Sequence, residues 1–490
     1  MPAGFSASDF YYLLPEFVLA AVAMAVLVAD IFVPRARAAV LAWISLAGIV
    51  ATLVALVPTA GVQTTIAWGM VAVDGFSLFF QTLFLLAAGI TVLMSVRYLQ
   101  IERARAGTFY FLVLCATLGM MFMAAGSDLV TIFVGLETMA ISFYVLAGFL
   151  KPSHRSNEAA VKYFLLGTFS LGLLLYGMSI LYGQSGTTNL HEIAVMLASQ
   201  ERSRWIVLAV ILVAAGVGFK IAAVPFHMWA PDVYEGAPTP ITAFLSVGSK
   251  AASFAMLLRI FVQGLPSLNA DWRLLFYVLA VMTMTVGNIA ALTQSNIKRM
   301  LAYSSIAHAG YLLIGVVAGT PRGITAMLVY LFIYAFMQLG AFAVVTMLRR
   351  QDVIGDELKD LSGLFARSPV AALAMLIFML SLGGIPPTAG FMGKFYLFGA
   401  AIDAGYVWLA VIGVLNSAVS LYYYIRVVVF MWIKTETIGS PTVIHPALAV
   451  ALTLTLAGTL FFGVYPRALF DFADASARTL GTLVVTAAVR

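Results

Sequence analysis

Apolar positions form long runs that recur along the whole chain and are separated by short polar segments. An apolar run of about 20 residues is long enough to cross the roughly 30 Å of hydrocarbon in a bilayer as an α-helix. The pattern therefore predicts about fourteen transmembrane helices. We place them at 11–32, 39–58, 74–96, 108–125, 129–150, 159–182, 205–224, 240–262, 273–293, 300–318, 323–348, 369–401, 405–433 and 444–463.

Composition agrees with a helical membrane protein. Of the 490 residues, 62% are hydrophobic and only 10% are charged, whereas a soluble domain of this size needs a more charged surface. A β-barrel would instead consist of short segments with alternating polarity, and the sequence has none. No basic residue precedes the first run and no small-residue cleavage site follows it, so we interpret it as a retained helix. The expected fold class is an all-α polytopic membrane protein.

Two of the predicted helices are interrupted by proline. Pro225 ends the helix that begins near Trp205, and the Gly-Gly-Ile-Pro-Pro run at 383–387 breaks another in mid-membrane. Because these are the seventh and twelfth helices, an odd number apart, they indicate two inverted five-helix repeats, each containing a broken helix. The expected parts are three N-terminal helices (1–107), a first repeat (108–262), a second repeat (263–434), and a C-terminal helix and tail (435–490).

Basic residues gather in alternate loops. By the positive-inside rule these loops are cytoplasmic, and both termini are then periplasmic. The net charge of +6 follows from this asymmetry and does not indicate nucleic-acid binding, because the charges are spread over many short loops. The loops of the basic side hold Arg35, Arg37, Arg97, Arg103, Arg105, Lys151, Arg155, Lys162, Lys298, Arg299, Arg349, Arg350, Lys359, Arg367 and Lys434.

Four charged residues fall well inside predicted helices: Glu137, Lys220, Lys250 and Lys394. A charge at a helix centre costs about 2.5 to 3.5 kcal/mol on insertion scales, so the four would cost on the order of 10 kcal/mol if unpaired. A structural ion pair or snorkelling lysines would be a simpler explanation, but snorkelling serves residues near helix ends. All four are expected at comparable depth, so we interpret them as a functional row across the membrane.

We predict that Glu137 and Lys220 form a proton-loading switch. Burial disfavours a charged lysine and a nearby carboxylate favours it, so the distance between the two decides whether Lys220 holds its proton. A change of charge at this pair would reach Lys250 next. His308 lies in a predicted helix on the route from Lys250 to Lys394, and we interpret it as a relay. A structural hydrogen bond is the alternative role for His308.

The other titratable residues in or beside predicted helices have structural interpretations. We interpret charges near helix ends as interfacial anchors or as groups within reach of water, and a histidine just beyond Pro225 as structural or part of an inner gate. This group contains Glu16, Asp30, Asp128, His227, Arg259 and Arg426.

The chain itself is expected to hold no cofactor and no metal. Cys115 is the single cysteine, whereas clusters and structural zinc sites need several thiolates at close spacing. Neither a GxGxxG turn nor a GxxxxGK[ST] loop occurs, and His191-Glu192 lacks the second histidine of a zinc protease motif. We expect any redox or nucleotide chemistry to lie in other subunits.

Three long segments carry a resemblance to a known family. They read GFKIAAVPFHMWAPDVYEGAPTPITAFL (218–245), LTQSNIKRMLAYSSIAHAGY (292–311) and GIPPTAGFMGKFYLF (384–398). They resemble the antiporter-like subunits of respiratory complex I, over about residues 74 to 434 of this chain. The chain is most similar to the N-type branch, because it lacks the C-terminal extension of L-type members. Ser246 stands where L- and M-type chains typically carry a histidine, and Lys394 where M-type chains tend to carry a glutamate.

The resemblance implies a proton-translocating subunit of an NADH:quinone oxidoreductase, without a redox centre of its own. In that family Glu137 would modulate Lys220, Lys250 with His308 would connect the halves, and Lys394 would lie on the exit side. NADH, FMN, iron–sulfur clusters and quinone would belong to partner subunits. M-type and small K-type neighbours and, through them, a peripheral redox arm are the expected partners, in a bacterial inner membrane.

Three alternatives remain at this point. The first is a cation/proton antiporter subunit, although lysines are poor sodium ligands. The second is the antiporter-like subunit of a membrane-bound hydrogenase, which shares the motifs. The third is a purely structural membrane subunit, which the row of buried charges disfavours.

Overall fold

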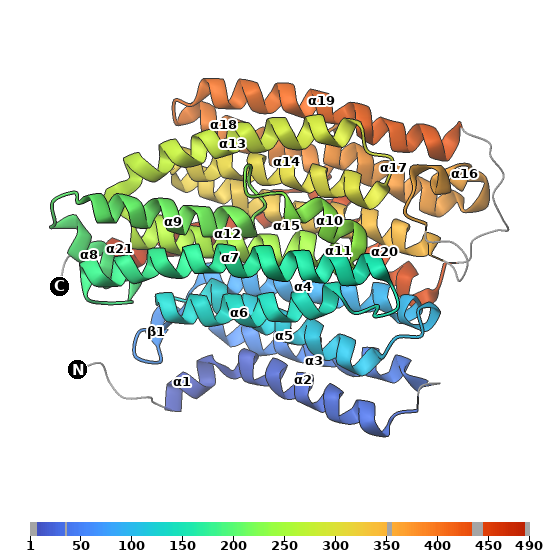
Figure 1. Ribbon diagram of the computed structural model, residues 1–490, viewed down its shortest axis with the longest axis horizontal. Coiled ribbons are helices and arrows are strands. Elements are labelled where there is room, and N and C mark those ends of the chain that lie inside the picture. The colour runs from blue at the N-terminus through green and yellow to red at the C-terminus, as the bar shows by residue number, and fades with distance from the viewer. Residues whose placement is uncertain (1–6, 35–36, 350–354, 434–443, 486–490) are drawn as a thin grey trace.

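The computed structural model describes residues 7–34, 37–349, 355–433 and 444–485 as a bundle of long helices that run along a common direction (Figure 1). The first and last described helices, α1 (Ala7–Tyr12) and α21 (Arg467–Val485), are found toward the same end of this bundle (Figure 1). The predicted boundary between the second repeat and the C-terminal part, at 434–435, lies outside the described residues. The same is true of Arg35, Arg350 and Lys434.

Twelve segments of the described chain are long and apolar enough to cross a membrane. They confirm twelve of the fourteen predicted spans. They are α2 (Leu14–Phe32), α3 (Ala39–Leu56) with the short turn η2 (Val57–Thr59), α4 (Gly75–Ile101), α5 (Ala106–Ala125), α6 (Leu129–Ala147), α7 (His154–Ser185), the run from α11 (Thr239–Phe244) through η3 (Leu245–Ser249) and α12 (Lys250–Leu257) to η4 (Leu258–Gly264), η5 (Pro266–Leu268) with α13 (Asn269–Leu292), α14 (Ile297–Ala318), α15 (Pro321–Leu348), α19 (Val407–Trp432) and α20 (Pro446–Val464).

The two remaining predicted spans are the interrupted ones, and both interruptions are confirmed. The span predicted at 205–224 contains α9 (Arg204–Lys220), and α10 (Trp229–Gly236) follows beyond its end; the span predicted at 369–401 contains α17 (Pro369–Gly383) and α18 (Ala389–Asp403). In each case the prolines lie in the gap, because proline has no N–H to donate and its ring clashes with the preceding turn. The grouping of the helices into two repeats stays a prediction.

Several smaller elements lie outside the predicted spans. A short antiparallel hairpin pairs β1 (Thr64–Ile66) with β2 (Val71–Val73). The connections also contain α8 (Leu190–Ala198), η6 (Leu358–Leu361) and α16 (Leu364–Arg367).

The C-terminal tail was predicted without a further helix, and this is corrected by α21. One side of α21 is buried, through Leu469, Ala473, Ala477 and Leu480. These residues recur at helical spacing but are interspersed with charged ones, so they form an amphipathic stripe and not a long apolar run. Phe76 at the start of α4 donates its backbone N–H to Thr479 of α21, at 3.0 Å.

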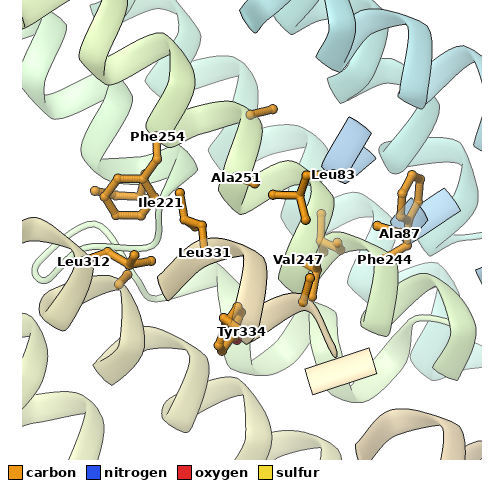
Figure 2. Close-up of a cluster of buried hydrophobic side chains, with 14 of the residues drawn as sticks. Leu83, Ala87, Ile221, Phe244, Val247, Ala251, Phe254, Leu312, Leu331 and Tyr334 are labelled. Carbon is orange, nitrogen blue, oxygen red and sulfur yellow. The ribbon is translucent and has the colours of Figure 1, made fainter. Parts of the chain in front are cut away.

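The centre of the bundle is formed by the segment from α11 to η4 together with α14 and α15, which are almost entirely buried within the described chain. Figure 2 shows apolar side chains meeting there from different elements: Leu83 of α4, Phe254 of α12, Leu312 of α14 and Leu331 of α15. Helices α2, α3, α7 and α19 instead present many exposed apolar side chains, as helices in contact with lipid do. A polar side chain on a central helix is therefore removed from both water and lipid.

Candidate functional site

The five predicted site residues lie on five different helices inside the bundle. Glu137 is on α6, Lys220 is the last residue of α9, Lys250 is the first of α12, His308 is on α14 and Lys394 is on α18. The three lysines are 3–4% exposed and His308 is 1% exposed. Burial of polar groups in this environment is tolerated only with internal partners. Those partners define the site.

Glu137 and Lys220 are neighbours without forming a closed ion pair in the described chain. Their charges are close enough to interact electrostatically, but Oε1 of Glu137 is buried without a hydrogen-bond partner among the described residues. Nζ of Lys220 instead lies 3.5 Å from the hydroxyl of Tyr144 and 5.6 Å from the centre of its ring. Tyr144 was missed from the sequence, although it follows Glu137 by seven residues and so lies on the same face of α6.

The first helix break determines where Lys220 lies. Because α9 ends at Lys220, the ammonium group is near the negative end of the helix dipole, which favours a cation. The indole of Trp229, at the start of α10, donates to the carbonyl of Phe219 at 2.9 Å. Its ring stacks on Tyr163 at 4.6 Å, and Tyr163 packs edge-on against Tyr144 at 4.7 Å. The tyrosine beside Lys220 is therefore positioned through α10.

Lys250 is bonded to a neutral partner on the neighbouring central helix. Its Nζ donates to both the backbone carbonyl and the hydroxyl of Ser305 on α14. It also lies 5.4 Å from the ring centre of Tyr334 on α15. Ser305 precedes His308 by three residues, so the two side chains lie on one face of α14. The predicted proximity of Lys250 to His308 thus has a direct structural basis.

His308 is bonded at both ring nitrogens to tyrosines that the sequence reasoning missed. Nδ1 lies 2.6 Å from the hydroxyl of Tyr330 on α15, and Nε2 lies 3.0 Å from that of Tyr424 on α19. The Tyr424 hydroxyl also bonds the hydroxyl of Ser304. A neutral imidazole has one donor and one acceptor, and each hydroxyl can do either. This cluster is therefore able to pass a proton in either direction.

Lys394 takes its partners from the second helix break. Its Nζ donates to the carbonyls of Leu382 and Gly383, at 3.0 and 3.1 Å, and to the hydroxyl of Ser417 at 2.8 Å. Both carbonyls belong to the last turn of α17, where helix carbonyls have no partner within the helix. Lys394 also lies 5.0 Å from the ring centre of Tyr311. The break and the lysine thus form one site.

Further polar side chains lie between the His308 cluster and Lys394. Asn288 on α13 donates to the Tyr311 hydroxyl at 3.1 Å and accepts from the Tyr423 hydroxyl at 2.9 Å. The rings of Tyr423 and Tyr424 are 4.4 Å apart. Asn288, Tyr423 and Tyr424 were not predicted, because a neutral polar residue in an apolar run costs little and does not stand out.

The expected roles of Arg259 and Glu16 are wrong. Arg259, expected at the interface, is 0% exposed and forms an ion pair with Asp74 at 2.9 Å. Glu16, expected within reach of water, is 5% exposed and accepts a hydrogen bond from Gln81 at 2.7 Å. Sequence distance from a helix end does not reveal that other helices cover that end.

Three other residues with structural interpretations bond backbone groups at helix ends, whereas Nδ1 of His227 is buried without a hydrogen-bond partner among the described residues. Asp128 caps α6 by accepting from the N–H of Val130 at 2.7 Å, and Asp30 accepts from the N–H of Gly107 at 3.2 Å. Arg426 donates to the carbonyl of Leu292, at 2.8 Å. None of these contacts involves the row of lysines.

The fold and the site together define a polytopic membrane protein with buried titratable side chains among its helices and two broken helices. Residues 126–420, more than half of the chain, match the family model described as "NADH:quinone oxidoreductase/Mrp antiporter, TM". The NADH-quinone oxidoreductase subunit N of Trichlorobacter lovleyi is 49% identical over 472 residues, covering 96% of this chain and 97% of that protein. Subunit N 2 of Solibacter usitatus is 46% identical over 485 residues, covering 96% and 98%. The chain therefore belongs to the antiporter-like family and, within it, to the NADH-quinone oxidoreductase N subunits.

Solved structures show the same fold. A chain of respiratory complex I from Thermus thermophilus with bound aureothin is 34% identical, with a TM-score of 0.80 over 94% of this chain and 99% of that chain. A chain of the archaeal membrane-bound sulfane sulfur reductase has a TM-score of 0.86 at 24% identity, covering 97% and 99%. At that identity the likeness concerns the fold alone.

Proposed function

We propose that this chain translocates protons as a membrane subunit of an NADH:quinone oxidoreductase of the complex I type. Glu137, Lys220, Lys250, His308 and Lys394 carry the proton transfer. NADH, FMN, the iron–sulfur clusters and quinone are bound by partner subunits, which include M-type and small K-type membrane neighbours and the peripheral redox arm. The family membership supports this assignment.

One observation carries the proposal for the site: the buried lysines are bonded to neutral partners in the described chain. Lys250 is held by a serine and Lys394 by two carbonyls and a serine. A lysine bonded to a carboxylate leaves an unpaired buried charge when it loses its proton, which is costly. A lysine with neutral partners avoids that cost, so it is suited to release and regain a proton in the membrane interior.

The Glu137–Lys220 pair starts the transfer. When the carboxylate is near, it stabilises the protonated lysine, and when the two separate, burial favours release of the proton. The released charge changes the electrostatic environment of Lys250, whose proton can reach His308 through Ser305 and the hydroxyls around it. From there the proton passes toward Lys394.

The orientation and the division of the chain belong to the same proposal. The first repeat (108–262) provides Glu137, Lys220 and Lys250, and the second (263–434) provides His308 and Lys394. The basic loops face the cytoplasm and both termini the periplasm of a bacterial inner membrane, which the distribution of arginine and lysine supports.

The test is made on the assembled complex in membrane vesicles, measuring NADH oxidation with quinone and proton uptake together. Glu137→Gln and Lys220→Ala are each expected to lower the number of protons taken up per NADH. Glu192→Gln is the matched control, because Glu192 is exposed on α8. Normal proton uptake in both site variants would refute the mechanism.

A further inference from the structure

The short helix α10, which follows the first break, is held by charged side chains from two other helices. Asp232 of α10 accepts from Lys162 of α7 and from Arg299 of α14, each at 2.7 Å. Arg299 also donates to Glu235 of α10, at 3.1 Å. These side chains line a cavity of 220 Å³ between α7, α10 and α14. They are not part of the lysine row, and the proposed proton path does not use them.

Lys298, the residue before Arg299, contacts the C-terminal end of α10. Lys298 is 3% exposed, and its Nζ donates to the carbonyl of Ala237, which directly follows α10, at 2.7 Å. Its second partner is the carboxylate of Asp356, at 3.9 Å. Lys298 and Arg299, two successive cations of α14, therefore both hold the eight-residue helix α10 in position.

These contacts are unsuited to carry protons. A carboxylate that accepts from two cations is stabilised in its charged form, so Asp232 does not readily take up a proton. The same holds for Arg299, because a guanidinium does not lose its proton in proteins. The cluster can instead fix a position, and it fixes α10 relative to α7 and α14.

The position of α10 reaches Lys220 through aromatic contacts. Trp229, the first residue of α10, bonds the carbonyl of Phe219 and stacks on Tyr163. Tyr163 packs on Tyr144, whose hydroxyl lies beside Nζ of Lys220. A displacement of α10 would therefore change the surroundings of the Lys220 ammonium group.

The same displacement would reach Lys250 through α14. Arg299 lies in the first turn of that helix, and Ser305, which accepts from Lys250, lies less than two turns further along. His308 follows on the same helix. Since a helix transmits a shift along its axis without bending much, the contacts of Arg299 with α10 link the surroundings of Lys220 to those of Lys250.

We propose that Arg299, Asp232 and Lys162 form an ionic clamp that couples the state of the Glu137–Lys220 switch to the Lys250–Ser305–His308 cluster. Arg299 and Asp232 are positioning residues, because they act through α10 and α14 and do not touch the transferred proton. This inference rests on the proposed proton path and adds to it the element that transmits its first step.

The test compares Arg299→Gln, Asp232→Asn and the double variant in the assembled complex. We expect each single variant to lower proton uptake per NADH while NADH oxidation with quinone continues. The double variant should lose less than the sum of the two single losses, because both single variants remove the Arg299–Asp232 contact. Arg299→Lys keeps the charge and should restore most of the uptake.

The matched control is Arg322→Gln. Arg322 pairs with Asp403 just beyond the other end of α14, where both side chains are exposed, so its loss should leave proton uptake unchanged. The pH profile of proton uptake provides a further readout: the clamp variants should shift it, whereas a general loss of stability would lower NADH oxidation and proton uptake in proportion. If Arg299→Gln does not assemble, Asp232→Asn and Arg299→Lys decide the question by the same measurements.

The result that overturns the clamp is distinct from the result that overturns the proton path. If Glu137→Gln and Lys220→Ala lose proton uptake while Arg299→Gln and Asp232→Asn behave like Arg322→Gln, the clamp is wrong and the path stands. Additive losses in the double variant would also contradict the clamp. Normal proton uptake in Glu137→Gln and Lys220→Ala would instead refute the proposed proton path.

Discussion

The two broken helices of this protein hold their lysines in different ways. Lys220 precedes the first break and has one weak hydrogen-bonding contact, at 3.5 Å from the Tyr144 hydroxyl. Lys394 follows the second break and donates three hydrogen bonds of 2.8 to 3.1 Å. A side chain with one long contact changes its surroundings at small cost, whereas one with three partners is fixed. The first break is therefore suited to a change of state at its lysine, and the second to holding its lysine in place.

The backbone at the first break is also more strained than the backbone at the second. Gly384 ends α17 at φ +83°, and a Cβ there would lie 2.9 Å from Cδ of Lys394. The second break therefore requires glycine for both backbone and space. At the first break Ala222, a residue with a side chain, adopts φ +59°. The first break is thus the one that carries local backbone strain.

The largest difference is expected from removing each lysine. Lys394→Ala removes three hydrogen bonds, which lowers the stability of the fold by about 3 kcal/mol, whereas Lys220→Ala removes one long contact and costs about 1 kcal/mol. Thermal unfolding of the purified complex, followed on this subunit, measures both. Equal losses of stability in the two variants would contradict the comparison.

The next largest effect is expected from Gly384→Ala. The added methyl group meets Lys394 in a left-handed backbone conformation, so we expect a loss of about 2 kcal/mol and a displaced lysine that lowers proton uptake. Gly405→Ala is the control, because Gly405 has φ +86° with nothing within 4 Å of its Cβ position. Gly405→Ala introduces the backbone strain without a steric contact, so this variant should keep full proton uptake. If the two variants pump equally well, contact with Lys394 is not what Gly384 protects.

A smaller effect is expected from Tyr144→Phe, which removes the hydroxyl beside Lys220 and keeps the ring. Loss of this one contact, worth about 1 kcal/mol, should lower proton uptake per NADH and shift its pH profile. Tyr176→Phe changes an exposed tyrosine of α7 and should have no effect. An unchanged pH profile in Tyr144→Phe would exclude the hydroxyl from the switch.

The smallest effect is expected at Asp356, which follows α15 in the chain. Lys298 contacts both the carboxylate of Asp356 and the carbonyl of Ala237 after α10. Burial raises the pKa of Asp356, partly offset by the nearby Lys298 and Arg349. A raised pKa in the folded protein means that the protonated acid favours the fold, so this contribution is present at low pH and is lost as the pH rises through the folded pKa.

We therefore expect Asp356→Asn to reduce the dependence of thermal stability on pH in the acidic range, by less than about 1 kcal/mol. Asp471→Asn is the control, because its carboxylate is 74% exposed. If the pH dependence of the Asp356 variant equals that of the control, burial does not raise the pKa of Asp356 in the folded protein.

Much of the fold could be predicted because a bilayer forces a simple rule on the sequence. Each apolar run must span the hydrocarbon, and proline must interrupt a helix, so the spans and both breaks were predicted within a few residues of their observed positions. The charged site residues could be found for the same reason, since a lysine in an apolar run is conspicuous. The helix α21 was missed because its apolar stripe is narrow and lies among charges.

The rest of the site depends on contacts between distant segments. Tyr330, Tyr424 and Asn288 look like ordinary residues of apolar helices, and only packing brings them against His308 or between its cluster and Lys394. Arg259 was misjudged because its partner, Asp74, is far away in sequence. Neutral hydrogen-bonding groups have too small an insertion cost to stand out, so sequence patterns identify the charges of a membrane site better than their partners.

The central claim is that the buried lysines form the proton path, and Lys250, in the middle of the row, tests it most directly. The measurement is the number of protons taken up per NADH oxidised in vesicles containing Lys250→Ala, beside Lys151→Ala, which changes an exposed lysine. We predict that Lys250→Ala keeps NADH oxidation with quinone but takes up fewer protons per NADH, while Lys151→Ala matches the unmodified complex. Equal proton uptake in both variants would contradict the account.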